Sequence, residues 1–119
     1  MTIAHTTNFA NAPMDGDTVT WSAIPNATQG DGVAGDWLTA YFQVGGTFGA
    51  AGSVQMEGSN DGVNWVILAG TAALTAAGFF APMTVNVRPK YIRPNVTAGD
   101  GTTALTVIGF LKKHRMGNM

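Results

Sequence analysis

The sequence predicts an all-β fold, a jelly-roll-like antiparallel β-sandwich of seven to eight short strands. Apolar residues alternate with polar ones along several segments, as they do in half-buried strands. Turn signals rich in Gly, Asn, Asp and Pro recur every ~8–12 residues, and no segment has the spacing of an amphipathic helix. The chain has 119 residues and no cysteine, so we expect one domain whose core is held without disulfides.

Three parts of the chain differ in pattern. Residues 1–16 show no hydrophobic period and are predicted to form an extended N-terminal arm. Residues 17–112 carry the alternating segments and are predicted to form the β-sandwich domain. Residues 113–119 are predicted to form a basic C-terminal tail.

The first two predicted strands have clear faces. Residues 17–23 place Val19, Trp21 and Ala23 toward the core, and a loop rich in Pro, Gly and Asp follows at residues 25–35. Residues 38–44 place their apolar side chains on one face and leave Trp37 and Tyr41 on the other.

A hairpin is predicted over residues 54–67. Its turn, residues 58–62, has the sequence Gly-Ser-Asn-Asp-Gly, whose residues tolerate positive φ and bond back to their own backbone. Trp65 is in phase with Val63 and Ile67 on the returning strand, so the pattern predicts that Trp65 is buried.

The second half of the chain continues the pattern. Residues 69–78 allow either a helical turn or a loop, and their glycines favour the loop, while residues 83–87 alternate as a strand. Residues 91–97 read as a strand in which Pro94 indicates an edge or a bulge, because proline cannot donate to a ladder. Residues 103–111 follow another turn and are apolar on both faces, which predicts a central strand.

Charge is sparse and segregated. Charged residues make up 11% of the chain, against roughly 25% in ordinary domains, which suggests that copies or partners cover part of the surface. Six of the seven acids precede residue 62 and all six bases follow residue 87. This segregation arises by chance, or it marks complementary patches that meet between subunits. The net charge of −1 argues against a dedicated nucleic-acid binder.

No membrane association is predicted. No apolar run approaches the roughly 20 residues of a membrane span, and the first residues lack the pattern of a signal peptide. We therefore expect synthesis in a cytoplasm and a soluble product.

The residues that could carry chemistry do not form a convincing site. His5 and His114 lie near opposite ends of the chain, and Glu57 and Asp61 flank the predicted turn, so we expect no enzyme. Oxygen ligands for calcium lack the regular spacing of a dedicated loop, and turn formation explains them better; they are Asp15, Asp17, Asp31, Asp36, Asn60 and Asp61. No metal or cofactor is predicted.

Aromatic and basic residues are the better candidates for contacts. Trp21, Trp37, Tyr41 and Trp65 could form a sugar-stacking platform, but Trp21 and Trp65 are in phase with core residues. Residues 112–115, Lys-Lys-His-Arg, form a basic cluster that is either a solvated tail, a contact to an acidic protein surface or, least favoured, a nucleic-acid contact. The residues predicted to contact a partner are Phe9, Trp37, Tyr41, Lys112, Lys113 and Arg115.

Two motifs carry a resemblance to known families. The hairpin Val54–Trp65, with its Ser-Asn-Asp-Gly turn and following Trp, resembles one found in discoidin-like, galactose-binding β-sandwiches. Tyr91-Ile92-Arg93-Pro94, followed by a Gly-Asp-Gly turn, resembles a later strand of the same domains. The pair of motifs is also similar to small decoration or cement proteins of tailed bacteriophages, which the absence of cysteine and the chain length favour.

The phage resemblance implies a structural virion protein. Such a protein would bind the outer face of the capsid, stabilise contacts between capsomers and take the major capsid protein as its partner. It would act as a homo-oligomer, a dimer or a trimer, on the outer surface of the virion. The alternatives are a carbohydrate-binding or adhesion module and a component of a phage tail or baseplate.

Overall fold

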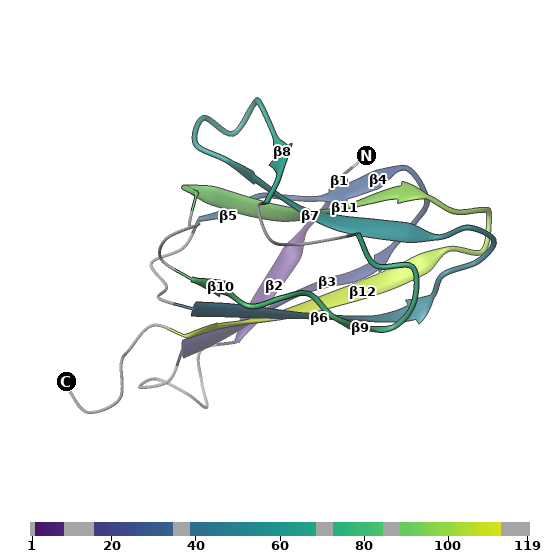
Figure 1. The fold of residues 1–119 in the computed structure, drawn as a ribbon, viewed down its shortest axis with the longest axis horizontal. Helices are drawn as coiled ribbons and strands as arrows, with labels where there is room; N and C mark the ends of the chain where they lie inside the picture. Colours follow the sequence, from purple (N-terminus) through teal and green to yellow (C-terminus); the bar gives the residue numbers. More distant parts are fainter. Residues whose placement is uncertain (1, 9–15, 35–38, 69–72, 85–88, 113–119) are drawn as a thin grey trace.

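The computed structural model describes residues 2–8, 16–34, 39–68, 73–84 and 89–112 of the chain. Its fold is shown in Figure 1. These residues form strands and no helix, which confirms the predicted all-β class. One sheet, which we name the β11 sheet, contains β1 (Thr2–Ile3), β4 (Thr28–Gly30), β5 (Val33–Ala34), β7 (Ser53–Ser59), β8 (Val66–Ile67) and β11 (Tyr91–Ala98). The other, the β12 sheet, contains β2 (His5–Asn8), β3 (Gly16–Ile24), β6 (Thr39–Thr47), β9 (Gly78–Phe79), β10 (Met83–Thr84) and β12 (Ala104–Lys112).

The two sheets pack as the layers of a sandwich (Figure 1). Eight strands run in the orders β4-β11-β7-β8 and β10-β6-β12-β3, so that most strands next to each other in sequence lie in opposite sheets. This is the strand order of a jelly roll. The remaining described strands, β1, β2, β5 and β9, are two to four residues long and add to the edges or gaps.

The described part of the predicted N-terminal arm belongs to both layers. Thr2–Ile3 pairs in parallel with β4, and His5–Asn8 pairs antiparallel with β3. Residues 2–8 therefore cross from one sheet to the other and extend an edge of each.

The core lies between the sheets and follows the predicted alternation. Trp21, Phe42 and Val44 are buried, and the rings of Trp21 and Phe42 lie 6.2 Å apart. Gly109 on β12 makes room for Phe42, since a side chain at position 109 would collide with its ring. The other core residues come from both sheets: Val19, Ile24, Val33, Ala40, Val54, Met56, Leu68, Phe80, Ile92, Val96, Leu105, Val107 and Leu111.

The prediction that Ala23 faces the core is wrong. A bulge in β3 places two residues opposite Thr106 of β12, and Ala23 has a φ of 55°. The Ala23 N–H donates to Thr106 Oγ1 at 3.2 Å, and the alternation resumes one residue later. Ile24 therefore takes the inward position.

The prediction that Pro94 marks an edge strand or a bulge is also wrong, because β11 is central. It pairs with β7 on one side and with β5 and β4 on the other. Pro94 itself lies opposite the gap between β5, which pairs with Tyr91 and Ile92, and β4, which pairs with Asn95 and Val96. The missing neighbour at this point explains how a central strand tolerates proline.

Two further expectations are settled by the pairing. The segment 25–35 is not all loop, since it contains β4 and β5. The prediction that residues 103–111 form a central strand is confirmed, because β12 pairs with β3 and β6 along its length.

Candidate interaction surfaces

The outer face of the β12 sheet is free of charge over its described central rows. Residues paired across neighbouring strands point to the same side of a sheet, so the register identifies this face. One row contains Thr6, Thr20, Ile108, Gln43 and Phe79, and the next contains Thr18, Phe110 and Tyr41. We call these eight residues the uncharged face.

Large apolar side chains are exposed on the uncharged face. Phe79 is 65% exposed, Tyr41 39% and Ile108 38%, and Phe110 between them is half-buried. Single exposed hydrophobic residues are common on soluble proteins, but four in adjacent rows form a patch. The prediction that Tyr41 points away from the core is confirmed.

A single charged side chain lies at one end of this face in the described part of the chain. Lys112 pairs with Thr39 in the row beyond Phe110 and is half-buried. Tyr41 and Lys112, both predicted contact residues, therefore share the outer face of one sheet.

A second apolar surface lies on the opposite side of the sandwich. Val63 is 76% exposed, Val66 67% and Ile67 54%, and all three belong to the loop and short strand that follow β7. Figure 1 shows this segment projecting from the β11 sheet, away from the β12 sheet. We call Val63, Val66 and Ile67 the β8 lip.

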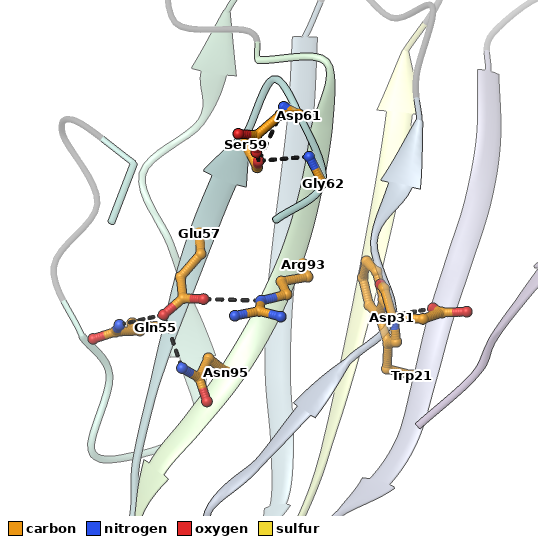
Figure 2. A network of polar contacts seen from close by, with 9 residues as sticks. All are labelled: Trp21, Asp31, Gln55, Glu57, Ser59, Asp61, Gly62, Arg93 and Asn95. Atoms are coloured by element: carbon orange, nitrogen blue, oxygen red, sulfur yellow. Dashed lines mark hydrogen bonds and ion pairs between the residues drawn. The ribbon is translucent and has the colours of Figure 1, made fainter. Parts of the chain in front are cut away.

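The outer face of the β11 sheet has the opposite character from the uncharged face. Glu57 of β7 is 5% exposed and accepts hydrogen bonds from three side chains (Figure 2). Arg93 Nε donates to Oε1 at 2.9 Å, while Gln55 Nε2 and Asn95 Nδ2 donate to Oε2 at 2.7 and 2.8 Å. We call these four residues the polar ladder.

The polar ladder keeps Glu57 ionised. Burial alone raises the pKa of this carboxyl, but the hydrogen bonds from Asn95, Gln55 and Arg93 and the charge of Arg93 outweigh it. The pKa of Glu57 is therefore lowered from its ordinary value of 4.5. Acidic and basic halves of the sequence meet here within one chain, because β11 pairs with β7.

The prediction that Trp65 is buried with Val63 and Ile67 is wrong. Trp65 is half-buried on the outside of the β11 sheet, where the Arg93 guanidinium lies 4.2 Å from its ring centroid. Its ring also reaches Gly32, where any larger side chain would collide with it. Trp65 thus packs on Arg93 of the polar ladder rather than joining the core.

The turn after β7 explains why the returning strand starts late. Asp61 Oδ1 accepts the N–H groups of Val63 and Asn64 at 2.8 Å, and Ser59 Oγ accepts that of Gly62 (Figure 2). The bonds from the Asn64 and Val63 N–H groups lower the pKa of Asp61, and together with the Ser59 bond they hold the backbone in an irregular loop. Regular pairing resumes only at Val66–Ile67, so residues 63–65 are not part of a strand although their sequence alternates.

The candidate catalytic and calcium residues whose side chains are described make contacts that hold the fold together. Asp31 Oδ1 accepts from Trp21 Nε1 at 3.0 Å (Figure 2) and lies 2.7 Å from His5 Nδ1. These contacts link β2 to the segment after β4 and to the core. Asn60 Oδ1 accepts the Lys90 N–H at 2.9 Å. Within the described residues, no three His, Asp or Glu side chains gather as a metal site would require.

Several predicted residues cannot be placed in the fold. Phe9, Trp37, Lys113 and Arg115 lie outside the described residues, as do His114, Asp15 and Asp36. In the part of the chain that is described, no helix is long and apolar enough to cross a membrane.

The comparisons with known proteins establish the fold. No family model matches the chain, and no curated protein matches it. The SPBc2 prophage-derived protein YomS has a similar structure, with a TM-score of 0.62 and 12% identity over 81% of this chain and 93% of that one. A hydroxypropylphosphonic acid epoxidase from S. wedmorenis, in complex with fosfomycin, shares 19% identity over 84% of this chain and 44% of that one. Its TM-score of 0.40 is too low to carry an argument. Nothing in the described residues or in these comparisons indicates an enzymatic activity.

Proposed function

We propose that the chain is a structural protein of a bacteriophage particle, a decoration protein that binds the outer capsid and stabilises contacts between capsomers. The observation that carries this proposal is the pair of exposed apolar surfaces on opposite sides of one sandwich, the uncharged face and the β8 lip. A protein that contacts one partner needs one such surface. A protein placed in a lattice contacts at least two neighbours, and two separate surfaces suit that role.

The fold and its neighbour support a phage origin. The jelly-roll order recurs in viral capsid domains. The similar protein YomS is prophage-derived, which is consistent with the same source. The resemblance of the 54–65 and 91–101 motifs to cement proteins points the same way.

A decoration protein needs no chemistry, only many equivalent contacts. Each copy contributes a small binding free energy, and occupancy of many sites on one shell adds these contributions together. Because such a protein binds the mature lattice and not the separated subunits, it stabilises the shell by mass action.

The test uses purified chain and expanded capsids that lack it. We expect the chain to sediment with the capsids and to saturate at a fixed ratio to the major capsid protein. Val66→Lys introduces a charge into the exposed β8 lip, and we expect it to weaken this capture without lowering the melting temperature. A chain that never sediments with capsids would refute the proposal, and gold label on tails rather than heads would favour the tail or baseplate alternative.

A carbohydrate-binding role is the second candidate because Trp65 is accessible beside polar groups. Within the described residues the Arg93 Nη atoms, Gln55 Oε1 and Asn95 Oδ1 make no side-chain hydrogen bond. Donors and acceptors beside an aromatic ring suit a sugar. Specific signals on a glycan array that disappear in Trp65→Ala would establish this role, and a blank array would remove it.

A further inference from the structure

We propose that two copies of this chain associate through their uncharged faces, the outer surfaces of the β12 sheets. This inference deepens the proposed function, because it assigns one of the two apolar surfaces to a sister copy and leaves the β8 lip for the shell. It is tested without capsids, so it can fail or hold independently of the decoration role.

The register makes the face continuous. Ile108 stands between Thr20 and Gln43, and Phe79 follows Gln43 in the same row. Phe110 stands between Thr18 and Tyr41 in the next row. Threonine, glutamine, tyrosine and phenylalanine side chains can be covered without leaving an ion unpaired, which is the main cost of covering a protein surface.

Its size fits a pair of copies. Five strands spaced ~4.8 Å apart give a width of about 19 Å from β2 to β9, and the nine-residue strands β3, β6 and β12 are about 30 Å long. The flat area of the whole outer face of the β12 sheet is at most roughly 600 Å², because β2 and β9 are shorter than the three long strands, and side-chain relief increases the accessible area. A standard interface covers about 800 Å² on each partner, so most of this face would be used.

The absence of charge on this face favours a second copy of the chain as its partner. A second copy presents the same uncharged surface. A two-fold interface therefore brings Tyr41, Ile108 and Phe110 of one copy against the same apolar patch of the other. Sheets that stack face to face lie ~10 Å apart with nearly aligned strands, which these side chains can fill. Lys112 stands at one end of the face, and strands that run antiparallel across the interface keep the two Lys112 ammonium groups at opposite ends.

The experiment measures the mass of the full chain in solution by sedimentation equilibrium between about 1 and 100 µM, a range that covers weak specific interfaces. We expect wild type to pass from monomer to dimer in this range. Ile108→Lys and Gln43→Lys each place a charge at the centre of the face, and we expect the dissociation constant to rise at least 100-fold. Both positions are exposed, so the melting temperature of the diluted monomer should not change.

A matched control and a rescue sharpen the result. Val66→Lys adds the same charge on the β8 lip and should leave the dimer intact. An equimolar mixture of Ile108→Lys and Ile108→Glu should recover a dimer that neither variant forms alone, because opposite charges then meet across the two-fold axis.

Three outcomes would overturn the inference. Wild type that stays monomeric at about 100 µM has no self-association of useful strength. A dimer that Val66→Lys dissociates, while Ile108→Lys leaves it intact, uses the lip instead. Assemblies that grow beyond the dimer would indicate a lip-to-face contact that does not close.

Discussion

The outer faces of the two sheets differ in which side chains they carry and in how many of these are already paired. On the β11 sheet, Glu57 is buried among Arg93, Gln55 and Asn95, and the Trp65 ring packs on the Arg93 guanidinium. On the β12 sheet, no charge occurs in the described central rows, and Tyr41, Phe79 and Ile108 are exposed. The first face pairs its buried carboxylate within the chain, whereas the second leaves apolar area uncovered.

This difference separates stability from assembly. Charged side chains that are already paired within the chain stabilise the fold and offer little to a partner. Exposed aromatic and aliphatic side chains add little to the fold, and their burial by a partner is favourable by roughly 25 cal/mol per Å². We therefore expect substitutions on the two faces to affect different measurements.

The largest effect is expected in the core beneath both faces. Trp21 is fully buried, and its Nε1 donates a hydrogen bond to Asp31 Oδ1. Trp21→Ala therefore removes both core packing and the hydrogen bond that holds the segment after β4. We expect a loss of about 3–5 kcal/mol in the free energy of unfolding, measured by urea denaturation. A loss below about 1 kcal/mol would contradict the packing of the two sheets described here.

The polar ladder comes next. Glu57→Gln keeps the shape of the side chain but removes the charge that Arg93, Gln55 and Asn95 bind. Charge-assisted hydrogen bonds contribute about 1.5–3 kcal/mol, and Arg93 can regain water because it is partly exposed, so we expect a loss of about 2–3 kcal/mol. The free energy of unfolding at pH 7 measures this loss. An unchanged value would show that the polar ladder does not stabilise the fold.

The same carboxyl predicts an acid-sensitive fold. Because the pKa of Glu57 is lower in the folded chain than its ordinary value of 4.5, its contribution is present above that value and is lost as pH falls through the folded pKa. The pKa values of Asp61 and Asp100 are also lowered, that of Asp100 to about 2 by the Ala50 and Thr102 N–H groups and the Thr102 hydroxyl. Melting temperatures should fall below pH 4.5 in wild type and fall less steeply in Glu57→Gln. Equal slopes would contradict the lowered pKa of Glu57.

Trp65 should matter less than Trp21. It is half-buried and contacts Arg93 through its ring, and a cation–π contact of this kind contributes about 0.5–1 kcal/mol. With its partial burial, we expect Trp65→Ala to lower the free energy of unfolding by about 1–2 kcal/mol. A loss as large as that of Trp21→Ala would restore the sequence-based view that Trp65 belongs to the core.

The smallest effect on stability is expected on the uncharged face. Thr20 lies beside Ile108, and Thr20→Lys places a long side chain in solvent. The free energy of unfolding of the monomer should therefore change by less than about 0.5 kcal/mol. Comparing the loss in the free energy of unfolding between Thr20→Lys and Glu57→Gln compares the two faces directly. A large loss from Thr20→Lys would mean that this face is covered within the chain.

The sequence predicted the inward side of the fold better than the outward side. The alternation of Ala40, Phe42 and Val44 has a single explanation in a two-layer sandwich, and all three are buried. The pattern places Trp65 wrongly because the Asp61 carboxylate accepts the backbone N–H groups of Val63 and Asn64 and interrupts the strand, which no periodicity reveals.

The uncharged face could have been predicted in part. Residues 103–111 are apolar on both faces, and each sheet of a two-layer sandwich has only one covered face. A doubly apolar strand therefore implies an uncovered apolar surface, which is where Ile108 and Phe110 lie. Phe79 could not be placed on that surface from sequence, because β9 is two residues long and its pairing with Gln43 depends on the fold.

The central claim, that this chain is a structural component of a phage capsid, is tested most directly by its copy number in purified particles. Quantitative mass spectrometry of density-purified virions, and of heads separated from their tails, gives the ratio of this chain to the major capsid protein. We predict one fixed ratio in both preparations, preserved through repeated purification. Absence from the particles, or loss of the chain when tails are removed, would contradict the claim.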